Sequence, residues 1–196
     1  MPREIKDGQK ESQALVAFGS NLGDPKKNIA RALVLLAEIP GVRVVKTSSL
    51  YETYPVGCSH DSLSFINGVV LLRTTLLPLE LLHELQWIER ALRRVRLEFW
   101  GPRTLDLDLI LYDDLIMRTP ELTLPHPRLQ WRDFVLAPSC EIVPEMTPPT
   151  LGLSFQSLKT LLDWNFATFP VVTALIYRGA RSSAKNQMVA SEGRKS

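Results

Sequence analysis

The sequence predicts an α+β fold. Four strand-like apolar stretches occur in the first 112 residues, and two amphipathic helical patterns separate them in the order β-α-β-β-α-β. This order is typical of the ferredoxin-like arrangement. We therefore expect a ferredoxin-like βαββαβ core, followed by additional C-terminal helices and loops.

The first strand and the first helix have clear boundary signals. Residues 14–18 form a short apolar strand, and a turn rich in Gly, Asn and Asp follows it. Asp24 can cap a helix that has Pro25 at its first position, a combination that favours helix initiation. The helix is expected to continue to about Glu38, because the pair Pro40-Gly41 ends it.

Two strands, a second helix and a fourth strand follow. Residues 42–51 begin with β-branched side chains, and residues 64–75 form the expected hairpin partner. Between residues 78 and 95 apolar side chains recur at spacings of three and four, as on one face of an amphipathic helix. Residues 105–112 alternate as a strand. The later helical patterns are short and lie near residues 128–137 and 156–164.

The chain is expected to consist of one folded domain between two extensions. The residues before Ala14 mix charges and lack an apolar stretch, which predicts a disordered N-terminus without a secretory signal. Residues 178–196 are polar and carry five basic side chains and one acidic side chain, so we expect them to be disordered as well. The expected division is a disordered extension at 1–13, a domain at 14–165 and a C-terminal extension at 166–196.

The composition argues against several classes of protein. With 23 Lys and Arg against 21 Asp and Glu, the net charge is +2, which provides no field to attract nucleic acid. The longest apolar run has six residues, whereas a membrane span needs about 20. Cys58 and Cys140 lie far apart without metal-ligating neighbours, which favours free thiols in a reducing cytosol. We therefore expect a cytoplasmic monomer that binds neither nucleic acid nor membrane.

The strongest candidate for chemistry is a pair of aspartates at the start of the fourth strand. Asp106 and Asp108 are two residues apart, so a strand places both carboxylates on one face, about 7 Å apart. Two carboxylates beside a core repel each other unless a cation lies between them, and their hard oxygens suit Mg²⁺ together with phosphate ligands. The competing interpretation is a solvent-facing strand edge with two surface aspartates.

Arginines crowd the segment before this strand. Five of them lie in that segment, at Arg90, Arg93, Arg94, Arg96 and Arg103. A cation-bound polyphosphate needs such guanidinium groups around its remaining charge. Arg90 and Arg93 can instead complement the dipole at the C-terminus of the second helix. This alternative explains the other three less well, because they lie at or beyond the helix end.

Two further groups could contribute to a site. His126 lies between two prolines and Arg132 follows it, although a lone loop histidine is more often structural than functional. Phe65 and Asn67 share one face of the third strand, where a ring and an amide could stack on and hydrogen-bond a flat heterocycle. A core phenylalanine and an asparagine near a strand bulge are the alternative. The turn Gly19–Gly23 lacks the Gly-Lys-Ser/Thr ending, which excludes a P-loop.

The sequence around the aspartates resembles a known enzyme family. WGPRTLDLDLILY is similar to the central motif of 6-hydroxymethyl-7,8-dihydropterin pyrophosphokinases, which act in folate biosynthesis. Further blocks follow the order and spacing of that family over about residues 14–165, namely FGSNLGDP, SSLYETYPVG, FINGVV, RRVRLEFWGPRT, LTLPHPRLQWRDF and CEIVPE. The resemblance implies an ATP-dependent diphosphotransferase, which transfers diphosphate from ATP to the hydroxymethyl group of the dihydropterin and releases AMP.

The resemblance also implies roles for individual residues. Asp106 and Asp108 match the ligands of two Mg²⁺ ions that bridge the ATP triphosphate. Arg94 and Arg96 match arginines of a mobile loop that closes over the phosphates. On the nucleotide side the matching positions are Gln86, Glu89, Arg103, Leu109, Thr123, His126 and Arg132. On the pterin side they are Thr53, Tyr54, Val56, Phe65, Asn67, Trp100 and Phe134, with Phe65 and Phe134 on either side of the ring.

Two other functions stay open on the sequence alone. The first is an RNA-binding module, since the ferredoxin-like fold is used for many functions and does not by itself identify one. The two aspartates argue against this function, because they would repel a phosphate backbone in the absence of metal. A degenerate relative that binds a nucleotide as a regulator is the second alternative, and the intact Asp-x-Asp sequence argues against it. No general base is apparent in the sequence, and we assign none. The attacking hydroxyl belongs to the substrate, and phosphoryl transfer depends mainly on positioning and charge neutralisation.

Overall fold

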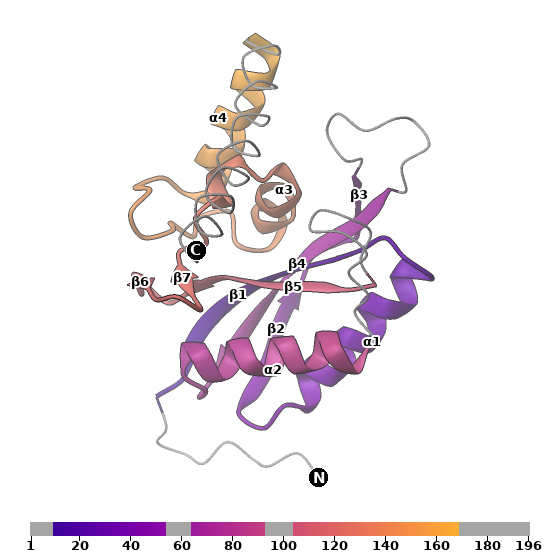
Figure 1. Ribbon diagram of the computed structural model, residues 1–196. Coiled ribbons are helices and arrows are strands. Elements are labelled where there is room, and N and C mark those ends of the chain that lie inside the picture. The colour runs from indigo at the N-terminus through magenta and orange to yellow at the C-terminus, as the bar shows by residue number, and fades with distance from the viewer. Residues whose placement is uncertain (1–9, 54–63, 93–103, 169–196) are drawn as a thin grey trace, which may run out of the picture.

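An antiparallel sheet forms the centre of the molecule (Figure 1). The computed structural model describes residues 10–53, 64–92 and 104–168. The strands of this sheet are β1 (Ser12–Ser20), β2 (Val42–Thr47), β3 (Tyr51–Thr53), β4 (Phe65–Thr74) and β5 (Asp106–Tyr112). Their order is β2–β4–β1–β5, and β3 pairs with the first residues of β4.

Two helices connect strands that are not neighbours. Helix α1 (Pro25–Glu38) joins β1 to β2, which lie on either side of β4, and α2 (Pro78–Ala91) joins β4 to β5, which lie on either side of β1. The predicted cap of α1 is confirmed, because the Asp24 side chain accepts a hydrogen bond from the Lys27 N–H at 3.1 Å and Pro25 occupies the first position. The second helix also begins at the predicted proline.

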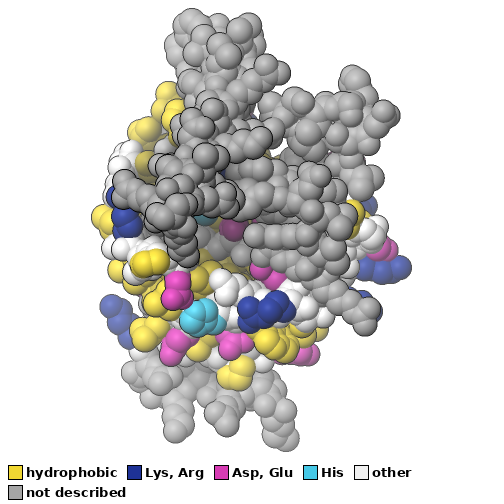
Figure 2. Space-filling model, in the orientation of Figure 1, with side chains coloured by type: hydrophobic (Ala, Val, Ile, Leu, Met, Phe, Trp, Pro, Cys, Tyr) yellow, Lys and Arg dark blue, Asp and Glu magenta, His cyan; other side chains and the backbone are white. Residues whose placement is uncertain are grey.

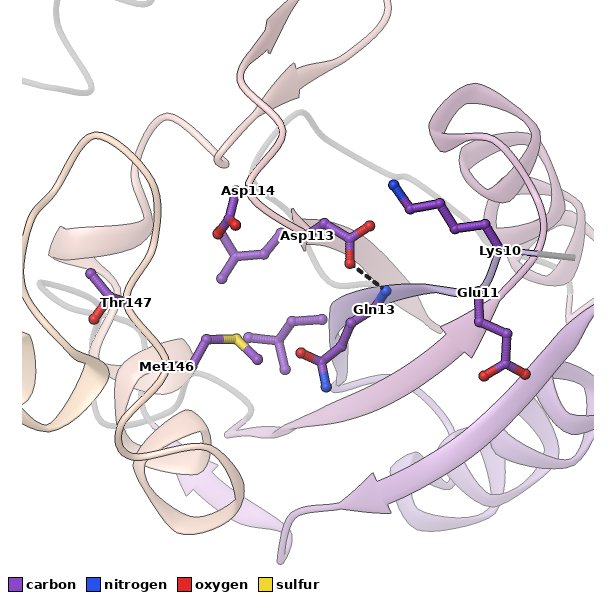
Figure 3. Close-up of a pocket in the computed structure, with 9 residues that line it drawn as sticks. Lys10, Glu11, Gln13, Asp113, Asp114, Met146 and Thr147 are labelled. Atoms are coloured by element: carbon purple, nitrogen blue, oxygen red, sulfur yellow. Dashed lines mark hydrogen bonds between the residues drawn. The ribbon is translucent and has the colours of Figure 1, made fainter.

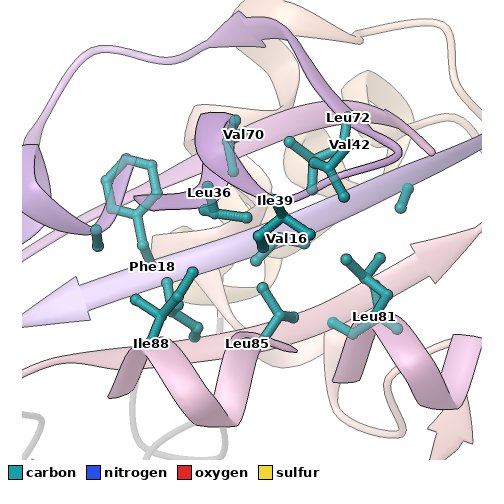
Figure 4. Close-up of a cluster of buried hydrophobic side chains, with 14 of the residues drawn as sticks. Val16, Phe18, Leu36, Ile39, Val42, Val70, Leu72, Leu81, Leu85 and Ile88 are labelled. Carbon is teal, nitrogen blue, oxygen red and sulfur yellow. The ribbon is translucent and has the colours of Figure 1, made fainter. Parts of the chain in front are cut away.

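The main core lies between the sheet and these two helices. Figure 4 shows Leu36 of α1 and Leu85 and Ile88 of α2 directed toward Val16 and Phe18 of β1. All five side chains are buried, which explains the spacing of three and four in α2 and the apolar run of β1. The sheet is thereby covered on one face by α1 and α2.

The other face of the sheet is covered by the C-terminal helices (Figure 1). A 3₁₀ helix (Leu129–Trp131) precedes α3 (Asp133–Ile142), and α4 (Phe155–Thr168) follows. Phe155 and Leu129 are buried there against Leu15 of β1 and Ile110 of β5. The sheet is therefore the middle layer of three.

Several boundaries differ from the sequence-based expectation. The expected strand 42–51 divides into β2 and β3, because the Ser48 hydroxyl takes the place of a backbone acceptor for the Val69 N–H at 3.0 Å. The expected extension 1–13 is too long, since Ser12 and Gln13 pair with β4 and Asp113 also holds the Gln13 N–H. The helix expected near 128–137 begins instead as the 3₁₀ turn and continues to Ile142 as α3.

Two short elements and a bulge in β5 were not predicted. Strands β6 (Met117–Arg118) and β7 (Thr123–Leu124) pair with each other after β5. Within β5, Leu109 faces Val16 and Leu111 faces Leu15, so that Ile110 is an extra residue in the ladder. Both Ile110 and Leu111 consequently pack on the side of α3 and α4.

None of the helices in the described ranges is long and apolar enough to cross a membrane. Cys140 is a free thiol, whereas Cys58 lies outside the described residues.

Candidate active site

The aspartate pair lies at the beginning of β5, as the alternation predicted. The side chains of Leu105, Leu107 and Leu109 are buried in the main core under α2. Asp106 and Asp108 therefore face the other side of the sheet, and both are half-buried. The two carboxylates thus stand next to each other on one strand face, at the border between the sheet and solvent.

The start of this strand is fixed by polar side chains that sequence reasoning missed. The Ser20 hydroxyl donates to the Thr104 carbonyl at 2.6 Å, and the Asn28 amide donates to the same carbonyl at 3.2 Å. Ser20 is fully buried at the end of β1, and Asn28 lies in α1. These bonds attach the backbone two residues before Asp106 to the end of β1 and to the first half of α1.

Arg132 forms an ion pair with one member of the aspartate pair. Its Nη1 lies 2.7 Å from Oδ2 of Asp108, and its side chain is only 15% exposed. The guanidinium carbon also lies 5.5 Å from the centre of the Phe134 ring, which places the cation over an aromatic face. The sequence placed Arg132 and Asp108 in one site, and the structure brings them into direct contact.

His126 is attached to the same strand. Its backbone N–H donates to the Ile110 carbonyl at 2.9 Å, and its ring Nδ1 accepts a hydrogen bond from the backbone N–H of Arg128 at 3.2 Å. Burial, assisted by the charges of Arg132 and Arg128 and opposed by Asp108, lowers the pKa of His126 to about 4. The imidazole is therefore neutral near pH 7, and with Nδ1 as acceptor its Nε2 carries the proton.

Glu89 supports the aspartate strand from α2. This carboxylate is 3% exposed, and Oε1 accepts the Leu107 N–H at 2.8 Å. Leu107 lies between the two aspartates, so the bond fixes the backbone that carries them. Gln86 lies one turn earlier on the same helix and is half-buried.

A second group of side chains lies at the junction of β3 and β4. Ile66 packs toward the main core, so Phe65 and Asn67 share the opposite face, as predicted. Asn67 is 7% exposed, and its Nδ2 donates to the Thr53 hydroxyl at 2.7 Å. Gly19 leaves room for this amide, because a Cβ at that position would lie 2.6 Å from Asn67 Oδ1. Phe134 lies in the first turn of α3, on this same side of the sheet.

Six of the predicted site residues lie outside the described part of the chain, namely Tyr54, Val56, Arg94, Arg96, Trp100 and Arg103. Thr123 is half-buried in β7. The Leu109 side chain is buried in the main core, so any contact of this residue with a nucleotide has to involve its backbone.

The donor set agrees with a hard cation. The described residues contain no cluster of three or more His, Cys, Asp or Glu side chains that would enclose a metal. Two adjacent carboxylates suit Mg²⁺ better than a metal that needs a complete protein cage, because Mg²⁺ keeps water and takes substrate phosphates as its other ligands.

A separate cavity of about 370 Å³ lies at the far ends of β1 and β5 (Figure 3). It is lined in part by Asp113, Asp114 and Glu11, together with Met146 from the segment before α4. None of the predicted site residues that the structure describes lines it.

A known enzyme family matches most of the chain. Residues 15–144 match the family described as 7,8-dihydro-6-hydroxymethylpterin-pyrophosphokinase. A 2-amino-4-hydroxy-6-hydroxymethyldihydropteridine pyrophosphokinase from Synechocystis is 41% identical over 167 residues, which are 85% of this chain and 84% of that protein. The protein of the same name from Bacillus subtilis is 46% identical over 129 residues, or 66% of this chain and 77% of that protein.

Longer proteins also match. The folic acid synthesis protein fol1 of Schizosaccharomyces pombe is 40% identical over 157 residues, which cover 80% of this chain but 21% of that protein. A crystal structure of Plasmodium falciparum HPPK-DHPS superposes with a TM-score of 0.67 at 15% identity, over 83% of this chain and 47% of the other. At this identity the superposition supports the fold alone.

Proposed function

This chain belongs to the 7,8-dihydro-6-hydroxymethylpterin-pyrophosphokinase family, and from that membership we propose how its residues act. It is a pyrophosphokinase of folate biosynthesis: it transfers diphosphate from ATP to the hydroxymethyl group of 6-hydroxymethyl-7,8-dihydropterin, and AMP is the other product. We assign its βαββαβ core to the ferredoxin-like class, on the basis of the interleaved β1-α1-β2 and β4-α2-β5 units.

The main support for the proposed site is the pair of half-buried carboxylates of Asp106 and Asp108 on one face of β5, together with the ion pair between Asp108 and Arg132. Asp106 and Asp108 would hold two Mg²⁺ ions, which when bound neutralise the triphosphate and orient it. Arg132 orients the Asp108 carboxylate through their ion pair and adds positive charge beside the phosphates. Glu89 keeps the strand between the two ligands in place.

His126 serves this site as a hydrogen-bond donor without charge. Its low pKa keeps the ring neutral, and Nε2–H is available to a phosphate or ribose oxygen. Arg128 and Arg132 supply the neighbouring positive charge. No step requires proton transfer to this histidine, in agreement with a reaction that depends on positioning and on charge neutralisation.

The pterin is proposed to bind at the junction of β3 and β4. Phe65 and Phe134 would stack on the two faces of the ring, and the Asn67–Thr53 pair would meet its polar edge. The residues outside the described part complete the proposal, with Tyr54, Val56 and Trp100 on the pterin side and Arg94, Arg96 and Arg103 on the phosphate side. On the nucleotide side Gln86, Leu109 and Thr123 are further proposed contacts.

We propose that the protein acts as a cytoplasmic monomer without nucleic acid. The face of the molecule in Figure 2 carries basic and acidic side chains interspersed over its described part, without a basic stripe. The small net charge of +2 likewise provides no strong attraction for nucleic acid.

The decisive experiment is a product assay with ATP, Mg²⁺ and the dihydropterin, in which AMP and ADP are resolved. We expect AMP in equal amount to the pterin diphosphate. Formation of ADP would indicate transfer of a single phosphoryl group and would overturn the proposal. A parallel titration with single-stranded RNA at two salt concentrations tests the RNA-binding alternative, for which salt-sensitive binding would be required.

A further inference from the structure

A carboxylate on α3 holds the segment between β2 and β3. Glu141 accepts the Ser49 N–H at 2.9 Å and the Ser49 hydroxyl at 2.9 Å, both at Oε1. Its Oε2 accepts the Tyr51 hydroxyl at 2.9 Å. Three donors from residues about 90 positions earlier in the chain thus converge on one side chain.

Helix stability does not explain this carboxylate. Glu141 lies in the last turn of α3, where a negative charge is unfavourable for the helix dipole and where no basic residue balances it. Burial alone would raise its pKa, but the hydrogen bonds from Ser49 and Tyr51 outweigh burial and lower the pKa of Glu141. The charge is therefore stabilised by its partners on the sheet side.

These partners lie next to the proposed pterin pocket. Tyr51 is opposite Asn67 in the ladder between β3 and β4, and Thr53 is opposite Phe65. The described part of β3 covers three residues, and it pairs with β4 alone among the described strands. The attachment to Glu141 fixes the start of β3 from outside the sheet.

Helix α3 connects this wall of the pocket with the other one. Phe134 lies in its first turn, directly after Arg132 and Asp133, and Glu141 lies in its last turn. The Lys46 ammonium on β2 adds a second tie at the same end, since it donates to the Ile142 carbonyl at 3.1 Å. The helix is thus held at its N-terminal end by the Arg132–Asp108 pair and at its C-terminal end by the β2–β3 segment.

We propose that Glu141 is a positioning residue for the pterin substrate. By holding Ser49 and Tyr51 to α3, it sets the distance between the β3–β4 wall, which carries Thr53, Phe65 and Asn67, and the α3 wall, which carries Phe134. This inference rests on the proposed pterin pocket. It predicts that loss of the carboxylate weakens pterin binding and leaves ATP binding intact, because the aspartate pair is attached to other residues.

The test compares Glu141→Ala with the matched variant Glu145→Ala in the full chain. Glu145 is an exposed carboxylate four residues further on, and no hydrogen bond or ion pair joins it to the described residues. For Glu141→Ala we expect the KM for the dihydropterin to rise about tenfold, which corresponds to about 1.4 kcal/mol. The KM for ATP should change less than about twofold, and Glu145→Ala should change neither constant.

Two milder variants keep the test valid if Glu141→Ala folds poorly. Tyr51→Phe removes one donor only, and Glu141→Gln keeps an acceptor oxygen for Ser49, so both should give a smaller rise, of about threefold, in the same constant. The dissociation constant of the dihydropterin, measured without turnover, should follow the KM.

The outcomes separate this inference from the proposed function. An equal rise in both KM values, or a lower melting temperature with an unchanged pterin constant, would reduce Glu141 to a structural residue. If the unmodified protein neither binds the dihydropterin nor forms AMP, the proposed function fails first and this inference fails with it.

Discussion

The two ends of β5 each carry a pair of aspartates, and the pairs differ in almost everything else. Asp106 and Asp108 are separated by a buried leucine, share one strand face and are half-buried beside Arg132. Asp113 and Asp114 are adjacent and exposed, and they follow the strand in a turn. They line a cavity that includes one cation among its described residues, Lys10 (Figure 3).

The second pair has a structural explanation. Asp113 adopts a φ of 43°, and its Oδ1 accepts the Gln13 N–H at 2.7 Å while its own N–H donates to the Gln13 carbonyl at 2.7 Å. A short polar side chain that bonds the backbone tolerates this left-handed conformation. Acidic residues at a strand end therefore do not by themselves indicate a metal site, whereas their spacing and their neighbours do.

The largest expected effect is at the first pair. Asp106→Ala and Asp108→Ala should each reduce AMP formation by about 10³-fold or more, because the metal charge that they hold contributes several kcal/mol at the transition state. The fold should survive, as judged by circular dichroism. Asp114→Ala is the control at the other end of the strand, and it should keep full activity; turnover that is equal in all three variants would remove the contrast.

The next effect concerns the arginines that precede the first pair. Arg94→Ala and Arg96→Ala should lower kcat by about 10²–10³-fold, because contacts that strengthen as charge builds on the transferred group act mainly on the transition state. ATP affinity should fall much less, since Asp106 and Asp108 remain. Single-turnover rates and ATP dissociation constants distinguish the two effects, and equal losses would indicate uniform binding instead.

A smaller effect should appear in the pH dependence of stability. The ordinary pKa of histidine is about 6.5, and that of His126 is lowered to about 4 in the folded chain. Between these values the unfolded state takes up a proton and the folded state does not, so stability is complete above the upper value and is lost as pH falls through the window.

Urea unfolding at pH 7 and pH 5 measures this loss. His126→Gln should show a loss of stability smaller by about 1–2 kcal/mol than that of the unmodified protein. An identical loss in both proteins would mean that His126 is not the group that titrates.

The smallest effect is expected at the second pair. Asp113→Ala should lower the unfolding free energy by about 1 kcal/mol, because the hydrogen bond to Gln13 is lost and alanine fits the left-handed turn less well. The KM values and kcat should not change. Asp113→Asn, which keeps an acceptor oxygen and tolerates the turn, should recover most of the stability; reduced activity in either variant would show that both ends of β5 matter to catalysis.

The parts of the site that could be predicted depend on local rules. The face shared by Asp106 and Asp108 follows from the period of two in a strand, and the start of α1 follows from Asp24 and Pro25. The motif resemblance predicted Arg132 as a nucleotide-side contact, and in the structure this residue forms an ion pair with Asp108. The roles of the individual site residues stay predictions.

The parts that could not be predicted depend on single polar side chains that act over long sequence separations. Ser20 and Asn28 hold the Thr104 carbonyl from 84 and 76 positions away, and neither position has a periodic signal. Ser48 ends β2 by replacing a backbone acceptor with its hydroxyl, although the surrounding residues favour a continuous strand. A side chain that acts in place of a backbone acceptor can be recognised only when the position of the partner strand is known.

The extra residue in β5 shifts the alternation of side chains between the two faces of the sheet by one position. Ahead of Ile110, odd-numbered residues face the main core; beyond it, the even-numbered Tyr112 does so, and its hydroxyl donates to the Leu76 carbonyl at 2.6 Å. Loss of one residue at this position would keep the aspartates on their face and the rest of the strand in register. Insertions or deletions closer to Asp108 would instead turn a carboxylate into the core, so homologous chains are expected to vary in length at the bulge and not ahead of it.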